Sequence, residues 1–331
     1  MNEKLLRPIL LNGHTRSLTK IKYNREGDLL FSVSKDHTPT VWYSHNGERL
    51  GTYDGHNGTC WDIDVNGTTT RVLTGSGDNT CRLWEATTGK ELHVFETKSA
   101  VRSVAFAFGD KEAIFVTDAT MGNKSTIHFI KIAENPEEQQ PPYKTITTNG
   151  SKFTIARWGY LNKTIVAGHD DGTITIFDSE TGEIVRKAKD HTSTIQDLQF
   201  SNDLSYFITA SKDTNSFIYD YETLKILKKY PTERPVNSAA ISPLKEHIIL
   251  GGGQDAMSVT TTSVTAGKFE VRFFHKIFQE EIGRVKGHFG PINTLAFHPS
   301  GKSFASGGED GYIRIHHLDP DYFTFKYDEE E

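Results

Sequence analysis

The sequence carries a repeat of about 42 residues, and this repeat limits the folds open to the chain more than any other feature. A dipeptide ending in histidine begins four copies, at residues 13–14, 55–56, 190–191 and 287–288. In each copy an aspartate follows the histidine by 22 residues, a hydroxyl residue stands four positions before that aspartate, and a ring stands six positions after it. Such a period predicts an array of similar units that bury their apolar faces against one another.

Three weaker copies lie on the same spacing. The seven repeats start at residues 13, 55, 97, 148, 190, 232 and 287. Repeat 3 is the least regular, repeat 4 keeps Asp171 and Phe177 but has Asn149 at the histidine position, and repeat 6 keeps Asp255. Repeats 3 and 6 are 9 and 13 residues longer than the others, which predicts an exposed proline-rich loop over residues 133–142 and a Thr-rich insertion over residues 257–268.

Within a repeat, short apolar or alternating segments are separated by turn residues. In repeat 1 they span residues 17–23, 29–33, 40–43 and 48–53, and no segment has a sustained helical period. Four strands in every 42 residues are typical of one blade of a WD40 β-propeller. The sequence therefore predicts an all-β, seven-bladed propeller with four antiparallel strands per blade.

A propeller must close its ring, because open sheet edges favour aggregation. Residues 7–11 precede the first repeat and can supply the outer strand that the last repeat lacks, and Pro8 is compatible with an edge strand. We therefore expect the N- and C-terminal segments to pair in one blade. Residues 5–327 are predicted to form this single propeller, and residues 328–331 a solvated acidic tail.

The repeated histidine, aspartate and hydroxyl residues are the residue types of a nucleophilic triad. An active site is needed once, however, whereas a structural hydrogen-bond network is needed in every blade. We therefore predict that each histidine bridges the aspartate and the hydroxyl, and that the hydroxyl can accept a hydrogen bond from the ring residue. The expected networks are His14, Ser32, Asp36 and Trp42; His56, Thr74, Asp78 and Trp84; His191, Thr209, Asp213 and Tyr219; and His288, Ser306, Asp310 and His316.

No other residues have the spacing of a catalytic or cofactor site. The 14 histidines include no pair with metal-ligand spacing. The segment GGGQD at residues 251–255 resembles a phosphate-binding loop, but no Gly-Lys-Ser/Thr follows it, so it is predicted to be a turn. We therefore expect no enzymatic activity, no metal and no cofactor.

Net charge, apolar runs and cysteine content indicate the cellular compartment and the kinds of partner to expect. The net charge of −6 argues against binding driven mainly by the charge of nucleic acid. Apolar runs are shorter than the roughly 18–20 residues of a membrane helix, and two cysteines cannot provide a disulfide framework. We expect a cytoplasmic protein without membrane contact or sequence-specific nucleic-acid binding. A propeller without a catalytic set is typically a platform for partners.

Several segments resemble one family, the WD40 subunit i of eukaryotic translation initiation factor 3. The resemblance extends over about residues 5–328. It is carried by YNREGDLLFS at residues 23–32, VWYSHNGERLG at 41–51, IILGGGQD at 248–255, FHKIFQEEIGRV at 274–285, GHFGPIN at 287–293 and SGGEDG at 306–311. It implies a non-enzymatic scaffold subunit of a complex that binds the small ribosomal subunit, helps to recruit initiator tRNA and mRNA, and supports start-codon scanning.

The resemblance also implies partners and two binding residues. It places a C-terminal helix of the b subunit on the flank of blades 5 and 6, and it adds a contact with the g subunit. Two acidic positions of the family match Asp203 and Asp220. We expect both on the rim opposite the Gly-His loops, where they would attract Arg or Lys of a helix or serve only as turn residues. The alternative function is that of a WD40 signalling adaptor that docks on a receptor or kinase.

Overall fold

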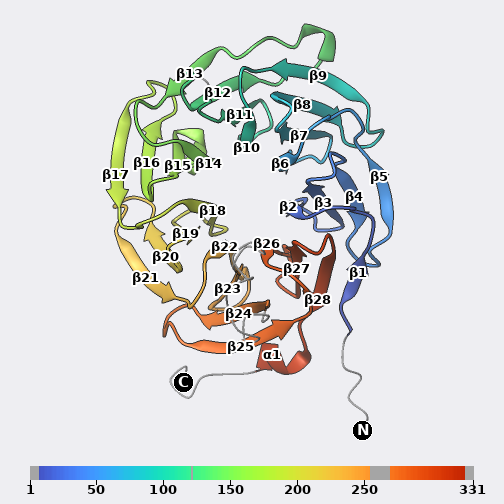
Figure 1. The fold of residues 1–331 in the computed structure, drawn as a ribbon, viewed down its shortest axis with the longest axis vertical. Coiled ribbons are helices and arrows are strands. Elements are labelled where there is room, and N and C mark those ends of the chain that lie inside the picture. Colours follow the sequence, from blue (N-terminus) through green and yellow to red (C-terminus); the bar gives the residue numbers. More distant parts are fainter. Residues whose placement is uncertain (1–6, 121, 254–268, 325–331) are drawn as a thin grey trace.

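The computed structural model describes residues 7–120, 122–253 and 269–324. The strands form seven four-stranded antiparallel sheets arranged radially around a central axis (Figure 1). The predicted all-β, seven-bladed propeller is thus confirmed. The predicted insertion at residues 257–268, Asp255 and the predicted acidic tail at residues 328–331 lie outside the described residues.

In each of blades 1 to 6 the strands follow chain order from the axis outward (Figure 1). Blades 1 and 2 consist of β2 (Leu18–Tyr23), β3 (Leu29–Ser34), β4 (Thr40–Tyr43) and β5 (Arg49–Thr52), and of β6 (Cys60–Val65), β7 (Arg71–Ser76), β8 (Thr80–Glu85) and β9 (Glu91–Glu96). Blades 3 and 4 consist of β10 (Val101–Phe106), β11 (Glu112–Thr117), β12 (Thr126–Lys131) and β13 (Lys144–Thr147), and of β14 (Phe153–Trp158), β15 (Thr164–His169), β16 (Thr173–Asp178) and β17 (Ile184–Lys189). Blades 5 and 6 consist of β18 (Ile195–Phe200), β19 (Tyr206–Ser211), β20 (Asn215–Asp220) and β21 (Ile226–Pro231), and of β22 (Val236–Ile241), β23 (His247–Gly252), β24 (Glu270–His275) and β25 (Glu281–Lys286).

The seventh blade closes the ring. It consists of β26 (Ile292–Phe297), β27 (Ser303–Gly308), β28 (Ile313–His317) and, on the outside, β1 (Ile9–Leu11). β1 pairs antiparallel with β28, so that Leu10 lies opposite Arg314. The predicted pairing of the two ends of the chain is therefore present, and Pro8 stands just before the edge strand, where its missing N–H removes no ladder bond.

Apolar side chains between neighbouring blades form the core. The second strand of each blade is buried along most of its length, as in β7 and β19, because both of its faces contact other blades. The outermost strand has much less cover, and β17 is exposed at nearly every position. The core is therefore a ring of clusters between blades rather than one central mass, and each blade depends on its two neighbours.

Every innermost strand contains a register shift at one residue. In β2, for example, Leu18 pairs with Ser34 and Lys20 with Val33, which leaves Thr19 as an extra residue. The corresponding residues of the other six blades are Trp61, Arg102, Thr154, Gln196, Asn237 and Asn293. A bulge of this kind bends the strand and redirects its side chains, here at the wall of the central channel.

Within residues 7–120, 122–253 and 269–324, helical structure is confined to three short segments that periodicity could not reveal. These are the 3-10 turns η1 (Pro136–Glu138) and η2 (Tyr160–Asn162) and the helix α1 (Pro320–Thr324). In α1, Tyr322 packs against the apolar cluster between blades 6 and 7, and its hydroxyl lies 2.7 Å from Nδ1 of His247. None of the helices in the described part of the chain has the length and apolar character needed to cross a membrane.

The predicted proline-rich loop contains η1 and connects β12 to β13. Most of its residues are exposed, as expected, but Gln139 is buried. The side-chain amide of Gln139 donates to the carbonyl of Lys131 at 2.6 Å and accepts from the backbone N–H of Ala133 at 3.0 Å. One glutamine thus holds the loop against the end of its own strand.

Candidate protein-binding site

Blade 1 brings all four residues of the first predicted network together. Nδ1 of His14 lies 2.8 Å from a carboxylate oxygen of Asp36, and Nε2 lies 2.7 Å from the hydroxyl of Ser32. The indole N–H of Trp42 donates to the same hydroxyl at 2.8 Å. Because a carboxylate only accepts, Nδ1 of a neutral His14 carries the proton, and Ser32 then donates to Nε2. The three hydrogen bonds thus point the same way: Trp42 donates to Ser32, Ser32 to His14, and His14 to Asp36.

These hydrogen bonds keep the aspartate ionised despite its burial. Burial alone would raise the pKa of Asp36, but hydrogen bonds from His14 and Ser34 more than offset it, and the pKa lies well below its usual range. The backbone N–H of Thr15 also donates to this carboxylate, at 3.0 Å. Since Thr15 follows the Gly-His dipeptide, the network fastens the loop between two blades to the second and third strands of blade 1.

Blades 2, 5 and 7 repeat the histidine contacts. His56 lies 2.8 Å from Asp78 and 2.7 Å from the hydroxyl of Thr74. His191 lies 2.8 Å from both Asp213 and the hydroxyl of Thr209. His288 lies 3.1 Å from Asp310 and 2.8 Å from the hydroxyl of Ser306. In blade 2 the indole of Trp84 donates to Thr74 at 2.8 Å, as Trp42 does to Ser32 in blade 1.

The ring residues of blades 5 and 7 do not join their networks. Tyr219 stacks on Phe207 at a centroid distance of 5.4 Å and makes no hydrogen bond to Thr209, and His316 stacks on Phe304 at a centroid distance of 4.9 Å. Neither side chain carries an indole N–H, so the donor that reaches the hydroxyl in blades 1 and 2 is missing. Tyr219 and His316 thus occupy the expected strand position, but neither donates to the hydroxyl of its network as Trp42 and Trp84 do.

Two further residues complete networks that the repeat pattern did not reveal. In blade 7, Nη1 of the buried Arg314 lies 2.8 Å from Nδ1 of His288 and 3.0 Å from Asp310. In blade 4, which lacks the Gly-His dipeptide, His169 bridges the hydroxyls of Ser151 at 2.9 Å and Thr175 at 3.0 Å. His169 comes from the end of a strand, so the fixed spacing from the repeat start could not find it.

Burial argues against a nucleophilic role for these sets. The hydroxyl residues Ser32, Thr74, Thr209 and Ser306 are each 0% exposed, so a substrate has no path to any of them. Each hydroxyl is held by its own histidine in a repeated arrangement. Among the described residues, no group of three His, Cys, Asp or Glu side chains could hold a metal ion. The networks therefore serve the architecture of the blades.

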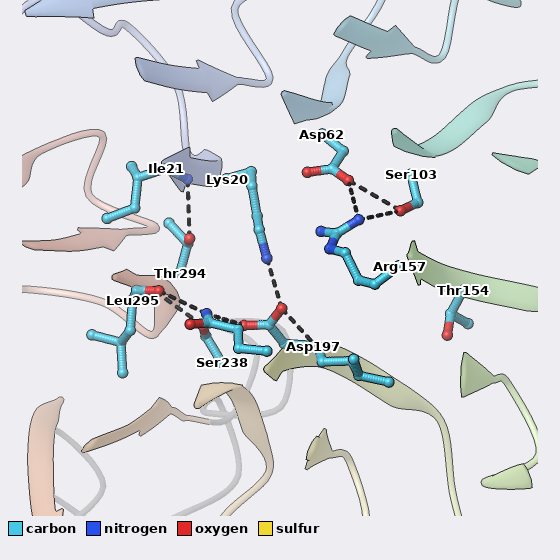
Figure 2. A network of polar contacts seen from close by, with 12 residues as sticks. Lys20, Ile21, Asp62, Ser103, Thr154, Arg157, Asp197, Ser238, Thr294 and Leu295 are labelled. Atoms are coloured by element: carbon cyan, nitrogen blue, oxygen red, sulfur yellow. Dashed lines mark hydrogen bonds and ion pairs between the residues drawn. The ribbon is translucent and has the colours of Figure 1, made fainter. Parts of the chain in front are cut away.

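The central channel is crossed by two ion pairs (Figure 2). Lys20 of blade 1 reaches Asp197 of blade 5 at 2.6 Å, and Arg157 of blade 4 reaches Asp62 of blade 2 at 3.1 Å. Burial would raise the pKa of Asp197, but the charge of Lys20 and the hydrogen bonds from Lys20, Ser238 and Gln199 together lower it below its ordinary value. The cavity of about 60 Å³ left in the channel is thus lined by charges that already have partners.

Polar side chains also link neighbouring blades around the channel. Ser238 of blade 6 donates to Asp197 at 2.5 Å and accepts from the backbone N–H of Leu295 in blade 7 at 3.0 Å (Figure 2). Thr294 of blade 7 accepts from the backbone N–H of Ile21 in blade 1 at 3.0 Å. These bonds connect strands that share no ladder, which stabilises the ring as a whole. The channel is therefore a structural centre rather than an open binding site.

The two acidic residues taken from the family resemblance lie on one rim of blade 5. Asp203 stands in the turn between β18 and β19, and Asp220 ends β20. The two turns are connected directly, because the backbone N–H of Tyr221 donates to the carbonyl of Ser205 at 3.0 Å. The Gly-His loops occupy the opposite rim, since they lie at the other end of the same strands. Both carboxylates are thus placed where the sequence predicted.

Each carboxylate is already used by its own turn. Asp203 accepts from the hydroxyls of Ser201 at 2.6 Å and Ser205 at 2.7 Å, and these bonds lower its pKa to about 2. Asp220 accepts from the hydroxyl of Thr223 at 2.6 Å and from its N–H at 2.7 Å, which lowers its pKa as well. Both therefore remain ionised at neutral pH, and both contribute to local turn structure.

A cleft of about 190 Å³ separates blade 5 from blade 6 on this rim. Its walls combine apolar and charged side chains, among them Phe200, Asp203, Tyr206, Ile241, Leu244 and Lys276. Asp220 lies beside this cleft rather than in its lining, and its pKa is influenced by the charge of Arg186 from blade 4. The structure thus places one of the two predicted carboxylates in the cleft and the other next to it.

Comparison with known proteins agrees with this architecture. The seven sheets and the repeated His-Asp-Ser/Thr networks define the chain as a WD40-type β-propeller. A family model described as EIF3I matches residues 6–328. The chain is 55% identical over 324 residues to eukaryotic translation initiation factor 3 subunit I of Xenopus tropicalis, covering 98% of this chain and 100% of that protein. The chain belongs to the EIF3I family.

Two other relatives show the same full-length similarity. The protein named eukaryotic translation initiation factor 3 subunit I in Danio rerio is 55% identical over 322 residues, which cover 97% of this chain and 99% of that protein. The protein of that name in Homo sapiens is 53% identical over 324 residues, with 98% and 100% coverage. The family resemblance recognised from the sequence is thus confirmed, and with it a role of the chain as a translation initiation factor.

Proposed function

We propose that the chain is a non-enzymatic scaffold subunit of the cytoplasmic initiation factor 3 complex, and that the cleft between blades 5 and 6 holds the C-terminal helix of the b subunit. The g subunit is the second proposed partner. By holding these subunits together, the propeller would support assembly of the complex on the small ribosomal subunit and start-codon scanning. Membership in the EIF3I family supports this proposal at the level of the complex.

The observation that carries the helix proposal is the mixed chemistry of the cleft. An amphipathic helix needs an apolar groove for one face and acceptors for the basic residues beside that face. Phe200, Ile241 and Leu244 supply apolar wall, and Asp203 supplies a carboxylate at the edge. Lys276 of the lining donates to the hydroxyl of Tyr206 and is already paired with Glu246. An arginine of the helix would therefore meet Asp203 without a competing free lysine at that point.

The test uses fluorescence anisotropy to measure binding of a labelled peptide that spans the C-terminal helix of the b subunit. Reversing both charges, with Asp203→Lys and Asp220→Lys, should abolish binding because a basic helix would then meet two lysines. The melting temperature should change by only a few degrees, since both sites are on the surface. Binding that survives the double charge reversal would refute the assignment.

Two matched variants separate charge from turn structure. Asp203→Asn with Asp220→Asn keeps a side-chain acceptor for each turn but removes both charges, so binding should weaken while the fold is unchanged. Asp178→Lys reverses the charge of the residue that caps the equivalent turn of blade 4, where its carboxylate accepts from the N–H groups of Glu180 and Thr181. This control should bind the helix normally.

A further inference from the structure

A second surface on the same rim has properties that the proposed helix site does not use. The turn between β10 and β11 exposes 78% of Phe108, and the turn between β14 and β15 exposes 52% of Tyr160 and 55% of Leu161. These three side chains define the blade 3–4 patch. The equivalent turns of blades 1, 2 and 7 carry polar residues instead, with the sequences NREGD, NGTTT and HPSGK. Large apolar side chains gathered at the surface typically mark an interaction site.

The two turns of the patch are joined into one unit. The side-chain amide of Asn162 accepts from the backbone N–H of Phe108 at 2.9 Å and donates to its carbonyl at 2.8 Å. This pair of bonds fixes the turn that carries Phe108 to the turn that carries Tyr160 and Leu161. The turn is held from the other side too, because Thr164 is hydrogen-bonded to the hydroxyl of Tyr221 in blade 5. The patch is therefore preorganised rather than a loose loop.

The backbone of the patch is held in an unfavourable conformation. Leu161 has a φ of 50° and Asn162 a φ of 58°, both in the left-handed region. Asparagine tolerates this region, but leucine does so rarely, because its Cβ approaches the following carbonyl. The result is that Leu161 projects to the surface instead of packing into the blade. Strain that persists in a rigid turn and presents an apolar side chain is a feature of binding sites.

The charges around the patch indicate the chemistry of its partner. Lys111 and Lys163 follow the two turns, and both are exposed without an ion-pair partner among the described residues. The one acidic residue between them and the apolar side chains, Asp110, is turned to blade 2, where it accepts from the N–H groups of Gly67 at 2.8 Å and Thr68 at 3.0 Å. Lys111 and Lys163 thus place two ammonium groups beside the apolar side chains, while the exposed Glu180 lies on the outer side, next to Ser179, which is hydrogen-bonded to Asn162 and Lys163.

We propose that the blade 3–4 patch binds a peptide segment of another subunit in which large apolar residues are flanked by Asp or Glu. The apolar residues would cover Phe108, Tyr160 and Leu161, and the acidic residues would pair with Lys111 and Lys163. Single-stranded RNA fits less well, because it needs a continuous basic groove with stacking rings, whereas the patch offers two lysines and one aliphatic side chain on a protein of net charge −6.

The first test replaces Phe108 with the photoreactive residue p-benzoylphenylalanine in the native complex. After irradiation, the crosslinked material is identified by mass spectrometry. A crosslink to a protein segment with apolar residues flanked by acidic ones is the expected result. A crosslink to RNA or to a basic segment, or no crosslink in an intact complex, would overturn the proposal. The same replacement of Phe289, an exposed ring on the opposite rim, measures background labelling.

The second test uses a synthetic peptide of the crosslinked segment. Phe108→Ser with Tyr160→Ser should weaken its binding at least about tenfold, because both anchors are lost. Lys111→Gln with Lys163→Gln should weaken binding and remove most of its salt dependence. Leu50→Ser alters an exposed apolar residue of β5 on the outside of blade 1 and should leave binding unchanged; equal binding by all variants overturns the proposal. The Asp203→Lys and Asp220→Lys variant should still bind this peptide, so the two sites can fail separately.

Discussion

Removing Asp197 should weaken the whole ring, because this residue holds three blades together. Its carboxylate is 2% exposed, lies 2.6 Å from Nζ of Lys20 and accepts from Ser238 at 2.5 Å and from Gln199 at 2.9 Å. In an Asp197→Ala variant Lys20 and Ser238 lose this acceptor, Gln199 keeps only the carbonyl of Leu295, and the ammonium of Lys20 stays in a site where it is only 14% exposed. The variant therefore loses more than one hydrogen bond.

The size of the effect follows from the uncompensated charge. Breaking a buried ion pair from one side typically costs about 3–5 kcal/mol. Unfolding entropy is roughly 2.1 cal/mol/K per residue, so in a chain of 331 residues this cost lowers the melting temperature by about 4–7 °C. Replacing both partners, with Lys20→Met and Asp197→Leu, should recover most of the loss, because no charge is then left without a partner.

The assay is thermal unfolding followed by circular dichroism, with urea titrations as an independent measure of the free energy. Lys189→Ala is the control, since Lys189 pairs with Asp171 at 3.0 Å while 59% exposed and should cost less than about 1 kcal/mol. Two results would contradict the reasoning: a loss in Asp197→Ala no larger than in the control, or a double variant whose loss equals the sum of the single losses.

Two other predictions concern the ring residues. Trp42→Phe removes an indole N–H that donates to Ser32 and should lower the free energy of unfolding by about 1 kcal/mol in a urea titration. Tyr219→Phe removes a hydroxyl that does not bond to Thr209 and should cost less; a loss as large as that of Trp42→Phe would contradict this. Burial lowers the pKa of His316 to about 4 from an ordinary 6.5, so the unfolded chain binds the proton more readily than the folded chain. The contribution of His316 to the free energy of unfolding should therefore be complete above pH 6.5 and fall as the pH approaches 4. His316→Phe, which can still stack on Phe304, should flatten that pH dependence by on the order of 3 kcal/mol, and an unchanged slope would assign it to other groups.

The repeat spacing predicted the parts of the structure that recur in every blade. It located the seven sheets and the pairing of β1 with β28, and it brought His14, Ser32 and Asp36 together although 22 residues separate the first from the last. These features depend on position within a repeat, and a constant period keeps that position the same. Family resemblance then supplied Asp203 and Asp220, whose residue types alone are those of ordinary turns.

Features that differ between blades could not be predicted in this way. The pair of Lys20 and Asp197 spans 177 positions and depends on which blades face each other across the channel. Arg314 and His169 enter networks from strand positions that most repeats fill with other residues. The blade 3–4 patch arises from one hydrogen-bonded asparagine and a left-handed leucine, and sequence patterns at Asn162 carry no signal for either.

The pairing of β1 with β28 also has a consequence for biosynthesis. Among the described strands β1 is the first and β28 the last, so translation produces the two partners of the closing sheet at opposite ends of synthesis. Until β28 is available, β1 has no ladder, and the blades at the two ends of the growing array each leave an apolar face uncovered. The separation of about 300 residues adds little entropy cost, because loop closure depends only logarithmically on length. We therefore expect the growing chain to be most prone to aggregation in the interval before the last blade emerges, when these apolar faces and the unpaired β1 are exposed together.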